Sequence, residues 1–408
     1  MIFTPDDTPL FSPISLGQSA EKELIASLLE EGFLSDPVLQ RVLASYAITD
    51  ELEKDRIILD LLKLLWERHS IHEVFLVFRE FDTFFAVLGK RGHFVHQFEV
   101  FILGWYLIRH LMCFDSVNKM LAKLGAVPEV FSTWLITSTA HDFGYPIALA
   151  TKLITSLAEL YQQLGANNLS HKYRSIEQEF PLTTELDLKQ MTTACFRNGK
   201  TTSMSIRQFI TEGIGETLGT EDTYEVLKLL ESNDDDGSVN HGYIGAALLC
   251  NAYIKGLERE KSIQNHNVLE DLHRLKLASA AIALHDPPPA LEDYVRKMAF
   301  YRNPYAYILF IVDNLQDWSR DLRPNDLYPS YNLIDIKSIN GENKIQIRYV
   351  LSHSKWEEDI TERTVGFLLK KERRLNLLPE PLPLVNLKLS VSFTDDLGRQ
   401  LKEVTLRL

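Results

Sequence analysis

The stretch that decides the fold, VFSTWLITSTAHDFGYP, runs from Val130 to Pro146. Its first eleven residues carry no charge, and their apolar side chains recur at the three- and four-residue spacing of a helix face. His141 and Asp142 close this helix. Adjacent side chains at a helix end can converge on one cation from two directions, and imidazole and carboxylate are both metal ligands. The stretch therefore predicts an apolar helix that ends at a candidate metal-binding pair.

Helical patterns continue on both sides of this stretch. An acidic start at Asp50 precedes apolar residues spaced three and four apart from Ile57 to Leu65, and hardly a strand pattern occurs before residue 325. The predicted helices cover residues 71–88, 93–112, 117–124, 128–140, 147–164, 206–217, 224–231, 242–258, 269–284 and 291–321, the last broken near Pro304. This series predicts one helical domain without strands over residues 49–328. Residues 165–236 exceed what a compact bundle needs, and we interpret them as an insert, which is either a lid or substrate-defining segment or merely decoration.

The sequence pattern changes after Asn325 from helical spacing to alternation. The stretches that alternate as strands do are 332–339, 344–351, 384–393 and 400–408, with turn sequences inside each pair and a helix at 357–377 between the pairs. The pattern predicts a small C-terminal α+β domain over residues 329–408 with mostly antiparallel strands. Residues 1–48 form an N-terminal lead-in. The expected fold class is therefore mainly α, with this small α+β domain at the C-terminal end.

Composition and charge narrow the functional class. With 408 residues, 45% of them hydrophobic and 24% charged, the chain is globular and long enough for two or three domains. Its net charge of −13 disfavours a nucleic-acid-binding protein, which needs positive charge against the phosphates. Three cysteines without CxxC spacing predict neither a thiolate zinc site nor a disulfide framework. Because we find no signal peptide and no long apolar run, we expect a cytoplasmic protein that does not contact a membrane.

Four further polar residues stand in apolar surroundings. His96 shares a helix face with core residues, His241 begins a helix of small residues, and His285 ends the apolar helix LASAAIAL. Asp313 follows six residues without a charge. Alone, each fits an ordinary role, as a core or capping histidine or as a carboxylate paired with arginine. A buried carboxylate is costly unless a cation compensates it, so together with the His-Asp pair these residues indicate a metal site.

The order of these residues resembles that of the HD superfamily of metal-dependent phosphohydrolases, whose pattern is H…HD…D on an all-helical bundle. Val100 stands four residues after His96, as an apolar residue does in the family, and PYAYILFIVDNLQDWSR looks like the closing helix of bacterial HD-domain proteins. The resemblance covers roughly residues 50–325. It implies a first metal shell of His96, His141, Asp142 and Asp313, to which dinuclear members add two histidines that match His241 and His285.

The resemblance also implies roles in catalysis. Asp142 would bridge two divalent ions. His96, His141 and Asp313 would hold one of them, and His241 and His285 the other. His93, one helical turn before His96, stands where cyclic-nucleotide phosphodiesterases keep a proton-donating histidine, so it is the candidate general acid. Arginines beside the proposed ligands are candidates for binding phosphate oxygens, although ordinary salt bridges suit them as well: Arg91, Arg302 and Arg320.

The expected function is hydrolysis of a small-molecule phosphoester, for example a nucleotide, by water activated on one or two divalent ions. Histidine and carboxylate ligands suit Mn, Fe, Zn, Ni or Mg and favour a transition metal. One alternative is a non-catalytic nucleotide- or metal-binding signalling or scaffold module, with the C-terminal domain as a partner or homo-oligomer surface. A second is a helical iron enzyme for oxygen chemistry, which the absence of Glu-x-x-His pairs at the proposed site disfavours.

Two departures from the family limit what the resemblance implies. The Gly-Lys that follows HD in many members is missing here, so phosphate contacts must come from elsewhere. The letters GYP stand almost directly after HD, whereas the cyclic-di-nucleotide hydrolases called HD-GYP carry them further downstream. We therefore reject that assignment.

Overall fold

The computed structural model of the chain describes the residues 40, 44, 57–64, 93–112, 115–166, 190–197, 200–231, 240–259, 268–316, 331–339, 344–351, 369, 372–378, 388–394 and 400–407. Several predictions lie outside these residues: the helix at 71–88, most of the helix at 357–377, most of the N-terminal lead-in, and the candidate phosphate-binding residues Arg91 and Arg320.

The chain divides into two compact units. Unit 1 comprises residues 1–64, 91–134 and 311–408, and unit 2 comprises residues 65–90 and 135–310. The boundaries fall inside α7 (Val127–Ala140) and α16 (Pro304–Leu315), so both helices contribute residues to both units. The predicted division at residue 328 stays a prediction.

The helical part of unit 1 is built on α5 (His93–Met112), which α6 (Asp115–Leu121) follows. Residues 94–108 are all buried, as expected of a helix that is apolar on nearly every side. Trp134 of α7 is fully buried, and its indole Nε1 donates to the carbonyl oxygen of Phe101 at 2.9 Å. This hydrogen bond satisfies the polar atom of a large core side chain and fixes α7 against α5.

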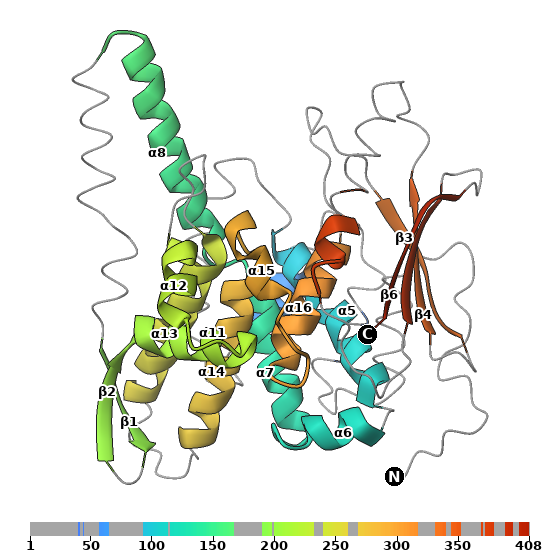
Figure 1. Cartoon of the computed structure of the whole chain (residues 1–408), viewed down its shortest axis with the longest axis horizontal. Coiled ribbons are helices and arrows are strands. Elements are labelled where there is room, and N and C mark those ends of the chain that lie inside the picture. Colours follow the sequence, from blue (N-terminus) through green and yellow to red (C-terminus); the bar gives the residue numbers. More distant parts are fainter. Residues whose placement is uncertain are drawn as a thin grey trace. The chain divides into compact units, whose positions relative to one another are not determined.

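The strands of unit 1 form one sheet in the order β3 (Tyr331–Ile339), β4 (Lys344–Leu351), β5 (Lys388–Thr394) and β6 (Gln400–Arg407) (Figure 1). The pairs β3–β4 and β5–β6 are antiparallel, and β4–β5 is parallel. A parallel neighbour needs a crossover connection, and the long segment between β4 and β5 supplies it. That these strands belong to a separate α+β domain stays a prediction.

Unit 2 contains a group of packed helices: α8 (Tyr145–Gln163), α11 (Ile206–Leu218), α12 (Thr223–Glu231), α13 (His241–Arg259) and α14 (Val268–Leu284). Both α11 and α13 pack against α14, and α8 packs against α13 (Figure 1). The C-terminal half of α14 is rich in alanine, and Ala280, Ala281 and Ala283 are fully buried. Such small side chains let the neighbouring helices approach α14 closely.

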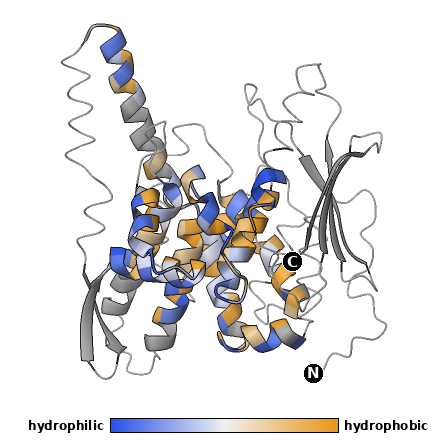
Figure 2. Cartoon of the chain, in the orientation of Figure 1, coloured by the Kyte–Doolittle hydropathy of each residue, from blue (hydrophilic) through white to orange (hydrophobic). Residues whose placement is uncertain are grey.

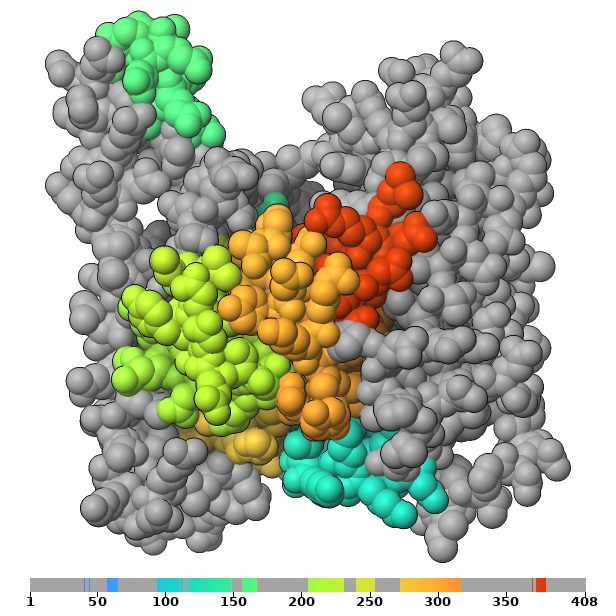
Figure 3. Space-filling model, viewed as in Figure 1, coloured from blue at the N-terminus to red at the C-terminus, as the bar shows by residue number. Residues whose placement is uncertain are grey.

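Local signals in the sequence set the ends of α11. Ser205 and Gln208 form a capping box at its start, with hydrogen bonds of 3.0 and 3.1 Å. Gly219 ends the helix in the left-handed conformation, with φ 63°. Both α11 and α12 present one hydrophobic and one hydrophilic face (Figure 2). The segments 206–231 and 289–303 lie side by side at the surface, where α12 contacts the short helix η1 (Pro289–Leu291) (Figure 3).

The predicted helices between residues 93 and 284 are confirmed, with ends within a few residues of the expected positions. The break predicted near Pro304 in the helical stretch 291–321 is confirmed, and it is wider than a kink. Residues 296–303 separate α15 (Glu292–Val295) from α16, and residues 317–321 lie outside the described residues. Pro304 begins α16, in agreement with the preference of proline for the first helical position.

A strand pair lies in the span for which the sequence predicts only helices. β1 (Gln190–Arg197) and β2 (Lys200–Ser205) are antiparallel, so the expectation of a strand-free span is wrong at this place. Both segments contain β-branched threonines, which favour extended backbone. The two residues between the strands are Asn198 and Gly199, the strongest short-range hairpin signal.

Two smaller expectations are also tested. Cys250 in α13 is buried and free, and burial raises the pKa of its thiol to about 12. The thiol is therefore protonated at neutral pH, which makes it a poor metal ligand and nucleophile.

No helix in the described part of the chain combines the length and the hydropathy that crossing a membrane requires.

Asn303 joins three helices of unit 2. Its side-chain Nδ2 donates to Thr217 Oγ1 at 3.0 Å and to the carbonyl oxygen of Leu277 at 2.9 Å. Its Oδ1 accepts from the backbone nitrogen of Ala306 at 3.1 Å and so caps α16. The side chain is fully buried, so each of these groups would be left without water if its partner were lost.

We expect Asn303→Ala to lower the free energy of unfolding by about 2–4 kcal/mol, because three hydrogen bonds are lost together, one of them a helix cap. Urea unfolding of the full chain measures this loss. Asn303→Asp keeps the acceptor at the cap, but it replaces the donor with a buried carboxylate oxygen beside the carbonyl oxygen of Leu277, so it should lower the free energy of unfolding at least as much. A loss below about 0.5 kcal/mol in Asn303→Ala, as for ordinary surface substitutions, would contradict the assigned role.

Candidate metal centre

The helices α7 and α14 end in the same way. The first residue after each helix is a histidine, His141 and His285, whose ring Nδ1 lies 2.6 and 2.7 Å from the carbonyl oxygens of Ser138 and Ile282. The last carbonyls of a helix have no partner inside the helix, so they are free to accept these bonds. A carbonyl oxygen only accepts, and therefore Nδ1 carries the proton. In the neutral ring the opposite nitrogen, Nε2, keeps its lone pair for another ligand.

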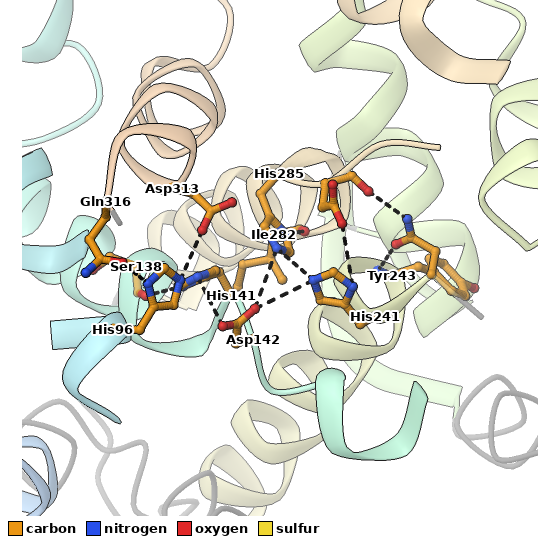
Figure 4. Close-up of polar contacts among 12 residues, drawn as sticks. His96, Ser138, His141, Asp142, His241, Tyr243, Ile282, His285, Asp313 and Gln316 are labelled. Carbon is orange, nitrogen blue, oxygen red and sulfur yellow. Dashed lines mark hydrogen bonds and ion pairs between the residues drawn. The ribbon is translucent and has the colours of Figure 1, made fainter. Parts of the chain in front are cut away.

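Asp142 lies among three imidazole rings in unit 2 (Figure 4). Its Oδ1 is 3.6 Å from His241 Nε2 and 3.8 Å from His285 Nε2, and its Oδ2 is 3.6 Å from His141 Nε2. The Nε2 atoms of His241 and His285 are 3.1 Å apart. One ligand atom from each of Asp142, His241 and His285 lies within 4.8 Å of the other two.

These spacings suit ligands of a cation. Imidazole and carboxylate ligands lie about 2.0–2.2 Å from a transition metal, so two neighbouring ligand atoms are about 2.9–3.5 Å apart in octahedral or tetrahedral geometry. The contact between the two Nε2 atoms falls in this range, and the contacts with Asp142 are slightly longer. Nε2 of His285 carries a lone pair and faces the carboxylate oxygen of Asp142, so the two atoms repel each other. A cation between the ligand atoms would turn this repulsion into attraction.

The burial of these side chains increases the need for a cation to compensate the charge of Asp142. The side chains of His141 and His285 are 0% and 1% exposed, and that of Asp142 is 11% exposed. A carboxylate withdrawn from water is costly without a cation or hydrogen-bond donors. The side chain of His241 is 17% exposed, so the group is closed on the side of His141 and His285 and more open on the side of His241.

The start of α13 positions His241. The side chain of the preceding residue, Asn240, caps the helix by accepting from the backbone nitrogen of Tyr243 at 2.8 Å, and it donates to the carbonyl oxygen of Asp286 at 3.0 Å. The carboxylate of Asp286 is 4.0 Å from His241 Nδ1 and favours a proton on that nitrogen. The His-Asp pair that ends α14 is thereby tied to the histidine that begins α13.

Gly144 permits the close approach of the turn after Asp142 to α13. A Cβ atom at this position would lie 1.9 Å from the carbonyl oxygen of His241 and 2.7 Å from the nitrogen of Gly245. The backbone of Gly144 is right-handed, with φ −80°, so the requirement for glycine comes from space and not from backbone conformation. Within the sequence FGYP that follows the His-Asp pair, the glycine is therefore required for this turn to pack closely against α13.

We expect Gly144→Ala to destabilise the protein by about 1–3 kcal/mol or more and to weaken metal retention, because α13 and His241 must move away from Asp142. Thermal unfolding and elemental analysis measure the two effects. Gly165→Ala is the control: a Cβ atom there would meet no atom within 4 Å, and its φ of 73° costs about 1–2 kcal/mol of backbone strain. If Gly144→Ala retained as much metal as Gly165→Ala, the packing argument would be wrong.

Unit 1 holds a second polar group. His96 of α5 places Nε2 3.1 Å from Asp313 Oδ1, and its Nδ1 is hydrogen-bonded to Gln316 Oε1. Gln316 Nε2 donates in turn to Glu99 Oε2. Glu99 and Gln316 are fully buried, and the side chain of Asp313 is 17% exposed. The imidazole of His96 therefore contacts the carboxylate of Asp313 through Nε2 and the buried amide of Gln316 through Nδ1.

The candidate residues of the sequence fall into these two groups. Unit 2 brings together His141, Asp142, His241 and His285, and unit 1 brings together His96 and Asp313. That all six share one centre stays a prediction. His93 is the first residue of α5, and its side chain lies outside the described part of the structure.

Arg302 has structural partners. Its guanidinium donates to the carbonyl oxygens of Leu218, at the C-terminal end of α11, and of Lys297, at 3.0 and 3.4 Å. A cation at the end of a helix satisfies free carbonyls and interacts favourably with the helix dipole. The proposed role of Arg302 in phosphate binding stays a prediction that these contacts do not support.

Sequence reasoning missed three residues of the two groups. Gln316 stands three residues after Asp313 and Glu99 three residues after His96, so each shares a helix side with a predicted ligand. Asp286 repeats the His-Asp pattern at the end of α14. These spacings were readable signals, but only the structure pairs the residues across long separations in the chain.

Comparison of the chain with models of protein families, with curated proteins and with solved structures gives no match. The described residues are mainly helical and include a buried His-Asp cluster that could hold a metal ion.

Proposed function

We propose that the protein is a metal-dependent phosphohydrolase that cleaves a small-molecule phosphoester with water, on an HD-type helical bundle. One observation carries the proposal: Asp142 lies among the Nε2 atoms of three histidines, two of which hold their protons on Nδ1. Neutral imidazoles whose Nε2 atoms surround a carboxylate form a donor set that suits a divalent transition metal. The HD order of the same residues in the sequence supports hydrolysis as the reaction.

The residues fit a bridging arrangement. The two oxygens of Asp142 face different histidines, Oδ2 toward His141 and Oδ1 toward His241 and His285. A carboxylate that is approached on both oxygens can serve two ions, so Asp142 is the proposed bridge. His141 would belong to one ion, and His241 with His285 to the other. His96 and Asp313 of unit 1 are the proposed further ligands of the first.

A bound divalent ion would lower the pKa of water and neutralise the charge of a phosphoryl group. The chain contributes the conditions for this chemistry. The hydrogen bonds from His141 and His285 to backbone carbonyls hold both rings in one tautomer and one orientation. The buried side of the group excludes bulk water, which strengthens electrostatic interactions there. The more exposed side, at His241, is where a phosphoester and water would enter.

The proposal is tested with the full chain after chelation. Mn, Fe, Zn, Ni and Mg are restored one at a time, and each sample is assayed on a panel of phosphomonoesters, phosphodiesters and nucleotides. We expect hydrolysis to return with at least one transition metal and to stay absent in the chelated protein. Metal binding without turnover of any substrate would contradict the proposal and would favour the non-catalytic module.

A further inference from the structure

Glu99, Gln316 and His96 form a hydrogen-bonded series inside unit 1, and Figure 4 shows Gln316 beside His96. Gln316 Nε2 donates to a carboxylate oxygen of Glu99, and Gln316 Oε1 faces Nδ1 of His96. The opposite orientation of the amide would place its oxygen against the carboxylate. Glu99 therefore fixes which end of the amide points at the histidine. Both Glu99 and Gln316 are fully buried, so no exchange with bulk water competes with these contacts.

The position of His96 in its helix explains why such a series is needed. His141 and His285 follow helix ends, where backbone carbonyls without a partner inside the helix accept hydrogen bonds from Nδ1. His96 lies inside α5, where the carbonyl oxygens form the helix ladder. A side chain must therefore provide the acceptor, and the oxygen of Gln316 lies at Nδ1.

We propose that Gln316 is a positioning residue that keeps a proton on Nδ1 of His96 and so directs Nε2 toward Asp313. Nε2 lies 3.1 Å from Asp313 Oδ1, a hydrogen-bond distance at which the carboxylate favours a proton on Nε2 in the metal-free protein. In the proposed function a divalent ion would take the place of that proton, so the inference rests on that function for its purpose. The proton on Nδ1 is a property of the metal-free protein and can be measured apart from any activity.

The test is nitrogen NMR of the full chain with ¹⁵N-labelled histidine, free of metal, at about pH 8, where an ordinary imidazole is neutral. His96→Gln identifies the signals of His96. In the wild-type protein we expect the shift of a protonated Nδ1. Gln316→Leu, which removes the acceptor at Nδ1, should lose this proton, because Asp313 then favours a neutral ring with its proton on Nε2. An unprotonated Nδ1 in the wild type, or a protonated Nδ1 in Gln316→Leu, would overturn the proposal.

Gln97→Leu is the matched control for burial on α5. Gln97 is fully buried, and neither amide atom has a hydrogen-bond partner among the described residues. It should leave the shifts of His96 unchanged, and an equal change in both leucine variants would count against a specific role of Gln316. Mn²⁺ titration calorimetry adds a second readout: Gln316→Leu should bind Mn²⁺ about 10–100-fold more weakly than wild type, and Gln97→Leu within about threefold of it. A failed phosphoester panel beside the expected protonation of Nδ1 would reject the proposed function and leave the positioning role standing.

Discussion

Asp142→Ala is expected to lose its metal and all phosphohydrolase activity while keeping its helices. Asp142 lies within 4 Å of Nε2 in each of His141, His241 and His285. Removing it takes away the negative charge that stabilises a divalent ion and the ligand proposed to bridge two ions. Apolar burial is the dominant favourable contribution to folding, and the buried apolar side chains of α5, α11, α13 and α14 are left unchanged by the substitution.

Elemental analysis, circular dichroism and the phosphoester assay measure the three parts of this prediction. Asp142→Asn keeps the shape of the side chain and removes its charge, so it should also lose metal. Asp293→Ala is the control for removing a carboxylate, since its side chain is 95% exposed and pairs with Arg296 only at 3.9 Å. It should keep both metal and activity. Full metal content and activity in Asp142→Ala would mean that the HD interpretation is wrong.

His93→Ala is expected to keep its metal and lose turnover by about a hundred- to ten-thousand-fold, the usual contribution of a general acid. The prediction follows from the resemblance and from helix geometry. His93 begins α5, and His96 lies three residues later, so both belong to one side of the helix. A residue that protonates a leaving group need not hold the ion.

The pH dependence and the leaving group separate this role from a structural one. A substrate whose leaving group needs no proton should be hydrolysed by His93→Ala almost as fast as by wild type, because the step that His93 assists is then dispensable. The wild-type decrease in kcat/KM at high pH should be absent in the variant. If metal and activity fell together, His93 would be acting on the metal site and not as an acid.

Much of the helical fold could be predicted because apolar spacing is a local signal. The helix α5 was expected at 93–112 and begins and ends there, and the buried ends of α7 and α14 follow from apolar runs that stop at His-Asp pairs. The strands β1 and β2 were missed although Asn198-Gly199 stands between them, because the helical pattern around them was weighted more than the turn.

The partners of polar side chains could not be predicted in the same way. Asn303 reaches Thr217 and Leu277, and Arg302 reaches Leu218, across long stretches of chain. Nothing near Arg302 in the sequence indicates that a helix end lies within its reach. Arginines next to a candidate site are therefore weak predictors of phosphate binding, because a free helix end competes for the same donors.

Elemental analysis of the freshly purified wild-type chain tests the central claim most directly. The account predicts one or two divalent transition-metal ions per chain, which dialysis against buffer leaves in place and a strong chelator removes. The same protein should regain the ions when metal is restored. A chain that carries no stoichiometric metal as purified, and binds none when incubated with Mn, Fe, Zn or Ni, would contradict the claim that Asp142 and its three histidines form a metal centre.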